Sequence, residues 1–279
     1  MVVDEYATAR PAVALRPFVA RYTGYRQRGL SPSRHRGLPS PHLTLIFTMD
    51  EPLVVAAHPD PRQAADRYPA LIGGLHLAPA LITHDGSQSG VQVAVHPVGC
   101  RLLLGVPAGE LAGLDLPASA VLGERFVEEV RERLRAAVDW AARFAVLDTM
   151  LGTLVRSGHA SSPQIGYAYR RLQLGSVSIS SLAAAVGWSG RHLTDRFRAE
   201  LGLRPKEAAR VIRFDRARRA LRPGVVLAAL AAEHGYADQS HLVRDFRAFS
   251  GCSPSQWMAD EFAFVQASAS GADHDGWHD

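Results

Sequence analysis

The stretch GYADQSHLVRDFRAFSGCSPSQW, residues 235–257, decides how the C-terminal part of this chain folds, because it repeats an earlier segment. The earlier copy reads GWSGRHLTDRFRAELGLRP, residues 187–205. With one residue inserted in the second copy, the identical pairs are Leu182/Leu230, Ala183/Ala231, Ala184/Ala232, Gly187/Gly235, His192/His241, Leu193/Leu242, Phe197/Phe246, Arg198/Arg247, Ala199/Ala248, Gly202/Gly251 and Pro205/Pro254. Chance would give roughly one or two such identities, so the chain contains a duplicated unit.

Each copy has the pattern of a helix–turn–helix. In the first copy, Ser178 is suited to cap a short helix and Gly187 to end it. A second helix is predicted at 190–201, with an apolar face formed by Leu193, Phe197 and Leu201. The second copy repeats this pattern, with its second helix starting near Asp238. Val226 stands where Ser178 stood, so this copy lacks a hydroxyl cap.

The copies are joined by PKEAARVIRFDRARRALRPG, residues 205–224, which predicts one long helix. Its arginines recur every third residue, at Arg210, Arg213, Arg216 and Arg219. A helix of about 17 residues spans about 25 Å and can hold two recognition helices roughly one DNA turn apart. The alternative is an amphipathic helix whose arginines form a solvated face.

Charge is concentrated in the same region. Residues 161–258 contain 15 basic and 7 acidic residues, and the only lysine of the chain is Lys206. A basic region of this kind is typical of nucleic-acid binding, and a solvated surface is the alternative.

Residues 177–257 resemble the DNA-binding domain of the AraC/XylS family of bacterial transcription regulators, most closely over 235–257. Carried over position by position, the resemblance implies base contacts by Arg191, Thr194, Asp195, Gln239, Ser240, Val243 and Arg244. Asp195 departs from the basic or amide residue often found there, and an acid can accept from cytosine N4. Contacts to the DNA backbone are expected from Ser189, His192, Arg198, His241 and Arg247.

The first 160 residues predict a compact β-barrel or sandwich that closes near Pro107. The expected strands are 42–49, 52–57, 70–77, 80–84, 91–97 and 100–106, and the expected helices are 107–113, 121–136, 139–156 and 163–174. Asp139 is a candidate cap. An apolar stripe of Val127, Val130, Leu134, Ala137, Ala141, Phe144 and Leu151 indicates a face packed on its own domain, with a dimer interface as the alternative.

This arrangement resembles family members with a cupin-like sensor barrel, on the motif GVQVAVHPVGCRLLLGVPAGEL, residues 90–111. The expected fold class is α+β: a cupin-like β-barrel with connecting helices, then an all-α domain of two helix–turn–helix units joined by a long helix. The expected divisions are a sensor barrel (1–118), a helical connector or dimerisation region (119–160), the AraC-type DNA-binding domain (161–262) and an acidic mobile tail (263–279).

The composition excludes several other classes. No apolar stretch approaches the ~18 residues of a membrane span, and Cys100 and Cys252 do not have metal-ligand spacing. His42, His76, His84 and His96 form no His-x-His pair, so we expect no metal, no cofactor and no enzyme activity. A reducing cytoplasm is expected from the cysteine usage.

Three hypotheses about control remain open. In the first, a sequence-specific regulator binds double-stranded DNA under the control of a small-molecule effector in the barrel. In the second, a protein partner controls the same regulator. In the third, a metal-dependent cupin enzyme is fused to a DNA-binding domain. RNA polymerase is the expected further partner if the protein activates transcription, and a homodimer is a further hypothesis.

Overall fold

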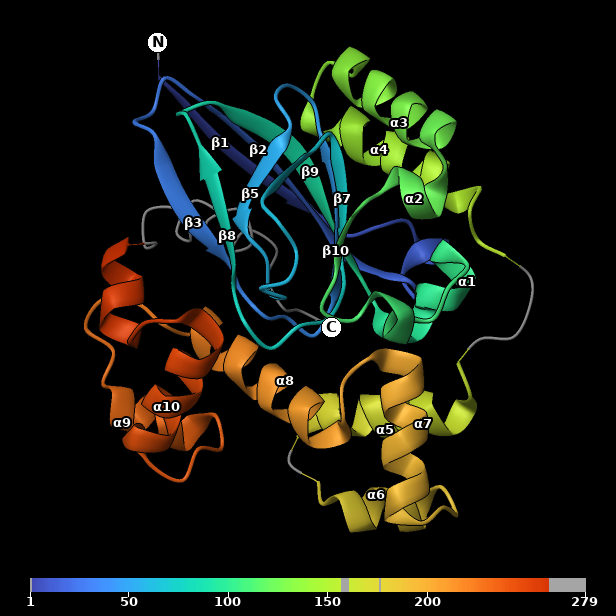
Figure 1. Cartoon of the computed structure of the whole chain (residues 1–279), viewed down its shortest axis with the longest axis vertical. Coiled ribbons are helices and arrows are strands. Elements are labelled where there is room, and N and C mark those ends of the chain that lie inside the picture. The colour runs from blue at the N-terminus through green and yellow to red at the C-terminus, as the bar shows by residue number, and fades with distance from the viewer. Residues whose placement is uncertain (1, 157–160, 176, 261–279) are drawn as a thin grey trace.

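The computed structural model describes residues 2–156, 161–175 and 177–260, so the predicted acidic tail at 263–279 lies outside the described residues. A strand-rich part, here called the sheet domain (2–156), is followed by helices, which confirms the expected α+β class (Figure 1). In the described part of the chain, no helix is long and apolar enough to cross a membrane.

Two antiparallel sheets form a sandwich in the sheet domain. The larger has the order β1 (Val3–Ala9), β2 (Val19–Arg28), β9 (Gln88–Val95), β4 (Leu43–Thr48), β7 (Ala70–Gly73) and β10 (Asp115–Pro117). The smaller has the order β3 (Ser33–Gly37), β8 (Ala80–His84), β5 (Leu53–Ala57) and β6 (Asp66–Tyr68). The predicted barrel or sandwich is therefore confirmed.

The larger sheet buries its outer face under α3 (Glu124–Ala136) and α4 (Trp140–Gly152), which lie beside it in Figure 1. Alternate residues of β4 and β9 point to this side, and Leu45 and Val93 are register partners with no exposed surface. From the helices, the buried members of the predicted apolar stripe are Val127, Val130, Leu134, Phe144 and Leu151. The stripe therefore packs on its own domain, as expected, and Asp139 caps α4 as predicted.

One predicted strand is wrong. Segment 100–106 forms α1 (Cys100–Leu104), which buries Cys100, Leu103 and Leu104 at helical spacing. It is preceded by η2 (Pro97–Gly99) and ends at Gly105, whose φ of 83° is left-handed. A short apolar run is compatible with a buried strand or a buried helix turn, and only packing distinguishes them.

Other boundaries also differ from expectation. The predicted helix 107–113 is a single turn, η3 (Ala108–Leu111), and the predicted helix 121–136 is divided at Gly123 into α2 (Ser119–Leu122) and α3. The predicted strand 70–77 ends at Gly73, and β1, β2 and β3 were not predicted. β2 and β3 are rich in arginine, and β1 contains two acidic residues, so these three strands lack the apolar pattern of a buried strand.

The remaining helices form two units around a central helix. The first unit is α6 (Ile179–Ala185) with α7 (Gly190–Leu201), and the second is α9 (Leu227–Glu233) with α10 (Gln239–Ser250). Between them runs α8 (Pro205–Arg219), and α5 (Pro163–Leu174) precedes the first unit (Figure 1). The predicted duplicated helix–turn–helix with a joining helix is confirmed, although α8 has 15 residues rather than about 17.

Candidate nucleic-acid interface

One face of α7 is exposed to solvent, because the opposite face packs into the core of the first unit. Leu193, Phe197 and Leu201 have no exposed surface. The helix begins at its cap Ser189, whose Oγ accepts from the amide of His192 at 3.2 Å. This orientation directs Arg191 and Asp195 outward, with 94% and 71% of their side-chain surfaces exposed.

The other candidates of the first unit are also on or beside this face. His192 and Arg198 are exposed, and Thr194 is half-buried with its hydroxyl donating to the Gly190 carbonyl at 2.8 Å. Arg191 lies 3.9 Å from Asp195, four residues on, at the outer limit of an ion pair. The first unit therefore offers one guanidinium and one carboxylate at the same place on the helix.

The second unit has the same construction. Asp238 caps α10 by accepting from the amide of His241 at 2.6 Å, and Leu242, Phe246 and Phe249 are buried. The predicted contact residues that remain exposed are Gln239, Ser240, Arg244 and Arg247, while Val243 and His241 are half-buried. Val226 makes no side-chain cap bond at the start of α9, as its residue type predicts.

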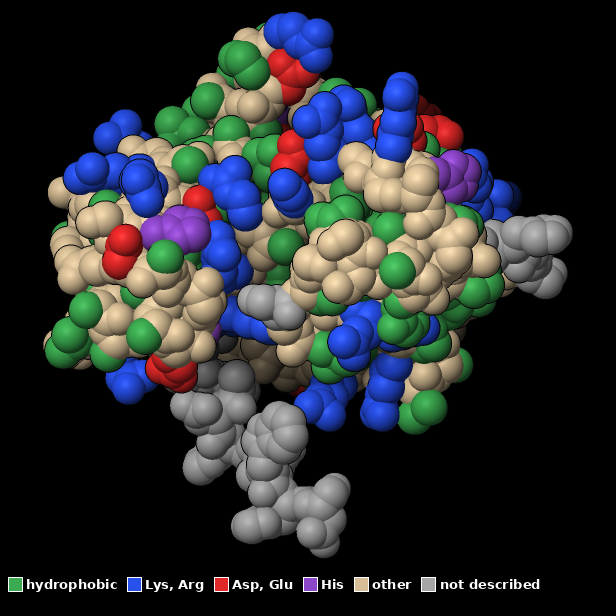
Figure 2. Space-filling model, turned by 90° about the horizontal axis from the view of Figure 1, so that it is seen from below, with side chains coloured by type: hydrophobic (Ala, Val, Ile, Leu, Met, Phe, Trp, Pro, Cys, Tyr) green, Lys and Arg blue, Asp and Glu red, His purple; other side chains and the backbone are tan. Residues whose placement is uncertain are grey.

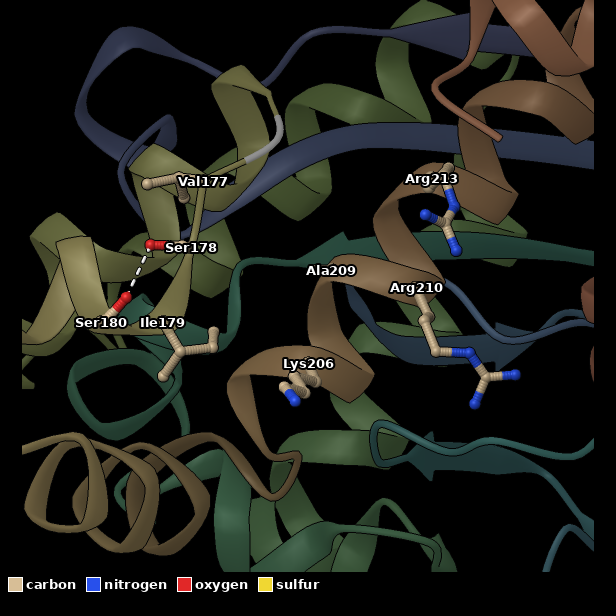
Figure 3. A pocket seen from close by; sticks show the side chains of 8 residues that line it. All are labelled: Val177, Ser178, Ile179, Ser180, Lys206, Ala209, Arg210 and Arg213. Atoms are coloured by element: carbon tan, nitrogen blue, oxygen red, sulfur yellow. Dashed lines mark hydrogen bonds between the residues drawn. The ribbon is translucent and has the colours of Figure 1, made fainter. Parts of the chain in front are cut away.

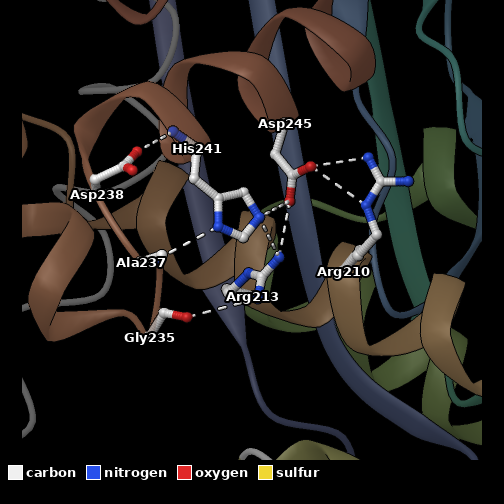
Figure 4. A network of polar contacts seen from close by, with 7 residues as sticks. All are labelled: Arg210, Arg213, Gly235, Ala237, Asp238, His241 and Asp245. Carbon is white, nitrogen blue, oxygen red and sulfur yellow. Dashed lines mark hydrogen bonds and ion pairs between the residues drawn. The ribbon is translucent and has the colours of Figure 1, made fainter.

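The arginines of α8 bind carboxylates and a carbonyl, so the alternative of arginines that contact only solvent does not hold. Arg210 and Arg213 reach Asp245 of α10 at 2.8 and 3.0 Å (Figure 4). Arg219 pairs with Asp215 of its own helix at 2.8 Å, and Arg216 donates to the carbonyl of Gln173. These side chains therefore hold the helices together.

Two buried carboxylates in this network, Asp215 and Asp245, were missed by sequence reasoning. Burial raises the pKa of the Asp215 carboxyl, but the charges and hydrogen bonds of Arg218 and Arg219 outweigh it and hold the pKa below its ordinary value. The available signal for Asp245 was its position between Leu242 and Phe246, on the apolar face of a predicted helix.

A hollow of about 560 Å³ lies between the start of α6 and α8. It is lined by Val177, Ser178, Ile179, Ser180, Lys206, Ala209, Arg210 and Arg213 (Figure 3). Figure 2 shows Lys and Arg side chains gathered in the furrow between two lobes of the end of the molecule that carries the helical units. Basic side chains at a concave surface are suited to the phosphate backbone of a nucleic acid, and Arg210 and Arg213 would make such contacts in addition to their ion pairs with Asp245.

Comparison with known proteins identifies the domain that carries this surface. Residues 182–260 match the family model of a helix-turn-helix domain, of AraC type. The chain therefore carries an AraC-type helix-turn-helix domain over these residues. The AraC-type domain marks it as a DNA-binding transcription regulator. Residues 7–117 match a domain of unknown function (DUF6597), and a search of curated proteins found no match.

The fold of the chain is similar to that of ToxT from Vibrio cholerae. The apo form of a single-substitution variant of ToxT has 8% sequence identity and a TM-score of 0.51, with coverage of 86% of this chain and 96% of ToxT. ToxT with a bound unsaturated fatty acid has 9% identity and a TM-score of 0.50, with coverage of 93% and 95%. The similarity supports the cupin-like sheet domain followed by helix–turn–helix units.

The first recognition helix of the AraC/XylS-family domain is attached to the sheet domain. Glu200 of α7, with 15% of its side chain exposed, accepts from Arg101 of α1 at 3.1 and 3.2 Å. The Ser161 hydroxyl donates to the same carboxylate at 3.0 Å. Burial raises the pKa of Glu200, but these hydrogen bonds hold it below the ordinary value. A movement of the sheet domain would therefore change the position of α7.

The four candidate histidines of the sheet domain do not converge on one point. The rings of His42 and His96 are 5.1 Å apart, His76 contacts the Ala78 carbonyl, and His84 contacts the Ser33 hydroxyl. Among residues 2–156, 161–175 and 177–260, no group of three His, Cys, Asp or Glu side chains could hold a metal ion.

Proposed function

We propose that this protein binds a specific DNA sequence through α7 and α10 and that its sheet domain controls this binding in response to a small polar effector. The observation that carries the proposal is the repeated exposure of one helix face in both units. In each unit the apolar side chains are buried, while the side chains suited to base edges point to solvent.

Base contacts are proposed for all seven outward candidates on the two recognition helices. Arg191, Gln239, Ser240 and Arg244 carry hydrogen-bond donors that can reach base edges in the major groove. Asp195 is suited to accept from cytosine N4, which requires that it leave its long-distance partner Arg191. Thr194 and Val243 can make apolar contact with a thymine methyl group.

Backbone contacts are proposed at the helix starts and flanks. Ser189 and His192 lie at the N-terminal end of α7, where backbone amides and the helix dipole favour a phosphate. Arg198 and Arg247 occupy matching exposed positions further along the two helices. His241 is half-buried and lies 3.2 Å from Arg213, so a phosphate contact there would add to an existing structural contact.

The effector is expected to be small and polar because the apolar space between the sheets is filled. The filling side chains are Ile46, Leu53, Val55, Tyr68, Leu71 and Ala80. A hollow of about 320 Å³ remains at one edge, and its lining includes Tyr25, Glu51, Arg67, His84 and Gln88. Its volume is near the lower limit for ligand pockets. ToxT has been solved with an unsaturated fatty acid, but this filled interior does not suit a long apolar chain.

Control by a protein partner is the second candidate, and the filled interior is the observation that favours it. RNA polymerase is proposed as a partner if the protein activates transcription, and a homodimer stays a prediction. The two forms of control differ in one measurement. A small effector stabilises the isolated protein against heat, whereas control by a protein requires the partner to be present.

The test of DNA binding is selection of sites from random duplex DNA with the full chain. We expect enrichment of two half-sites about one helical turn apart, with affinity that falls as salt rises. Failure to enrich any sequence at low salt contradicts the proposal.

The test of effector binding is thermal unfolding in the presence of small polar metabolites. Arg67→Ala, which alters the hollow, should remove a stabilising shift. Arg62→Ala, which breaks an exposed ion pair with Asp60 outside the hollow, is the matched control and should leave the shift intact. If the effector still raises the unfolding temperature of Arg67→Ala, it binds outside this hollow.

A further inference from the structure

A buried carboxylate joins the second recognition helix to the central helix. Asp245 of α10 is 5% exposed, and its Oδ1 accepts from both Nη2 and Nε of Arg210, at 2.8 and 3.2 Å. Its Oδ2 accepts from Nη2 of Arg213 at 3.0 Å (Figure 4). Both arginines belong to α8. A buried charge is stable only when it is paired. Separation of α10 from α8 would remove Asp245 from the two arginines that balance its charge.

The same two arginines contact the rest of α10 along one stripe. Arg213 lies 3.2 Å from Nε2 of His241, and the Arg210 guanidinium lies over the Phe249 ring at 5.0 Å from its centroid. His241, Asp245 and Phe249 are four residues apart, so they form one row along the helix. α8 therefore holds this row from its start to its end. Arg244 and Arg247 remain exposed outside the row.

This buried connection between a recognition helix and α8 occurs in the second unit and not at the equivalent position of the first. In the duplicated alignment Arg196 stands where Asp245 stands, and Arg196 is exposed. The first unit is instead continuous with α8, because only residues 202–204 separate α7 from α8. The second unit follows α8 through the longer segment 220–226. The orientation of α10 relative to α7 therefore depends on side-chain contacts with α8.

We infer that Asp245 is a positioning residue that sets the distance and rotation between the two recognition helices, and so the half-site spacing that the protein accepts on duplex DNA. This inference rests on the proposed function. A shift of one base pair moves a half-site along and around the duplex. A rigid connection rejects the shifted site, and a loosened one tolerates it. If the connection is loosened, Arg244, the exposed neighbour of Asp245, remains on α10 but is no longer held in one orientation relative to α7.

The decisive variant is Asp245→Asn, which keeps the shape and removes the charge. Its matched control is Asp215→Asn, since Asp215 is also a buried carboxylate with two arginine partners at 2.8 Å, but within α8 alone. Both variants, as full chains, are compared with wild type on the DNA sequence that wild type selects. They are also tested on versions with one base pair added to or removed from the segment between the half-sites, and on one half-site alone.

Wild type should bind the selected spacing about 10-fold more tightly than the shifted ones, which is the scale of one mismatched base pair. In Asp245→Asn this ratio should fall to about 2-fold, while affinity for one half-site stays within about 3-fold of wild type, because only the connection between units is altered. Asp215→Asn should keep the wild-type ratio.

Three results would overturn the inference: an unchanged ratio in Asp245→Asn, an equal loss in Asp215→Asn, or a wild-type protein that binds all spacings equally. If circular dichroism shows that Asp245→Asn does not fold, Arg210→Gln replaces it. It removes one of the two arginines that pair with Asp245, at a side chain that is 43% exposed. A wild-type ratio in this variant would contradict the inference equally. Absence of any selected sequence for wild type is a different outcome, because it removes the proposed function itself.

Discussion

At the residue scale, we predict that Arg244 contacts bases and that Arg247 contacts the DNA backbone. They are exposed and one turn apart on α10. Arg244→Ala should flatten base preference at one or two positions, because a bidentate contact to guanine contributes about 1–3 kcal/mol of discrimination. Affinities for the selected site and its single-base variants measure this effect.

Arg247→Ala is expected to act differently, because Arg247 lies one turn further from the helix start, where we expect α10 to leave the groove and pass the DNA backbone. It should weaken binding to all sequences similarly and reduce the slope of log affinity against log salt by about 1. A salt series on both variants makes the comparison. If Arg247→Ala changes base preference and Arg244→Ala does not, α10 enters the groove in another orientation.

At the element scale, the start of α9 can be stabilised by a better N-cap residue. Val226 has the extended backbone of an N-cap, is 66% exposed and makes no cap bond, whereas Ser178 caps the equivalent helix α6. Val226→Ser should raise the free energy of unfolding by about 0.5–1 kcal/mol, because it supplies an acceptor to a free amide. Urea denaturation measures the change. Val138→Ser, at a strongly exposed valine outside a cap position, should not stabilise.

The packing of η3 on α7 depends on the absence of a side chain at Gly109. A Cβ atom there would lie 2.1 Å from the carbonyl oxygen of Ala199, which is backbone and cannot rotate away. Gly109→Ala should therefore destabilise the protein by about 1–3 kcal/mol through overpacking. Gly152→Ala at the end of α4, where a Cβ would meet nothing within 4 Å, is the matched control. Equal midpoints of thermal unfolding for the two variants would contradict the close approach.

At the scale of the whole molecule, stability should decline as the pH falls from about 6.5. Burial lowers the pKa of His42 to about 3, with contributions from His96 and Arg21 of the sheet domain and Arg219 of α8. The unfolded chain binds a proton near the ordinary value of 6.5, while the folded chain does not bind it until much lower pH. The stabilisation is therefore complete above pH 6.5 and decreases below it.

Thermal unfolding between pH 8 and pH 5 measures this dependence. His42→Asn should make the decline shallower, because one proton-binding difference between the folded and unfolded states is removed. His192→Asn, at an exposed histidine of α7, serves as the control. A slope that is the same in wild type and His42→Asn would show that His42 is not the source.

Local features of the chain were sufficient to predict the helical units. Helix periods, the caps Ser178 and Asp139, and the repeated glycine and proline positions act over a few residues, so they can be read without knowledge of the fold. The outward-facing positions of α7 and α10 followed for the same reason. In the sheet domain the apolar strands β4, β5, β8 and β9 were found, but β1 to β3 were not, because they lack the apolar pattern of a buried strand. In addition, β2 and β3 pair with β9 and β8, which lie far along the chain.

The sequence by itself determined the duplicated helix–turn–helix, its joining helix and the faces that bury apolar side chains, because these depend on interactions within one or two helical turns. Only the tertiary structure decided which arginines are free. Arg210 and Arg213 meet a carboxylate more than 30 residues away, and Glu200 meets Arg101 of the sheet domain. Electrostatic pairing depends on distance in space and on burial, and neither can be read from spacing along the chain.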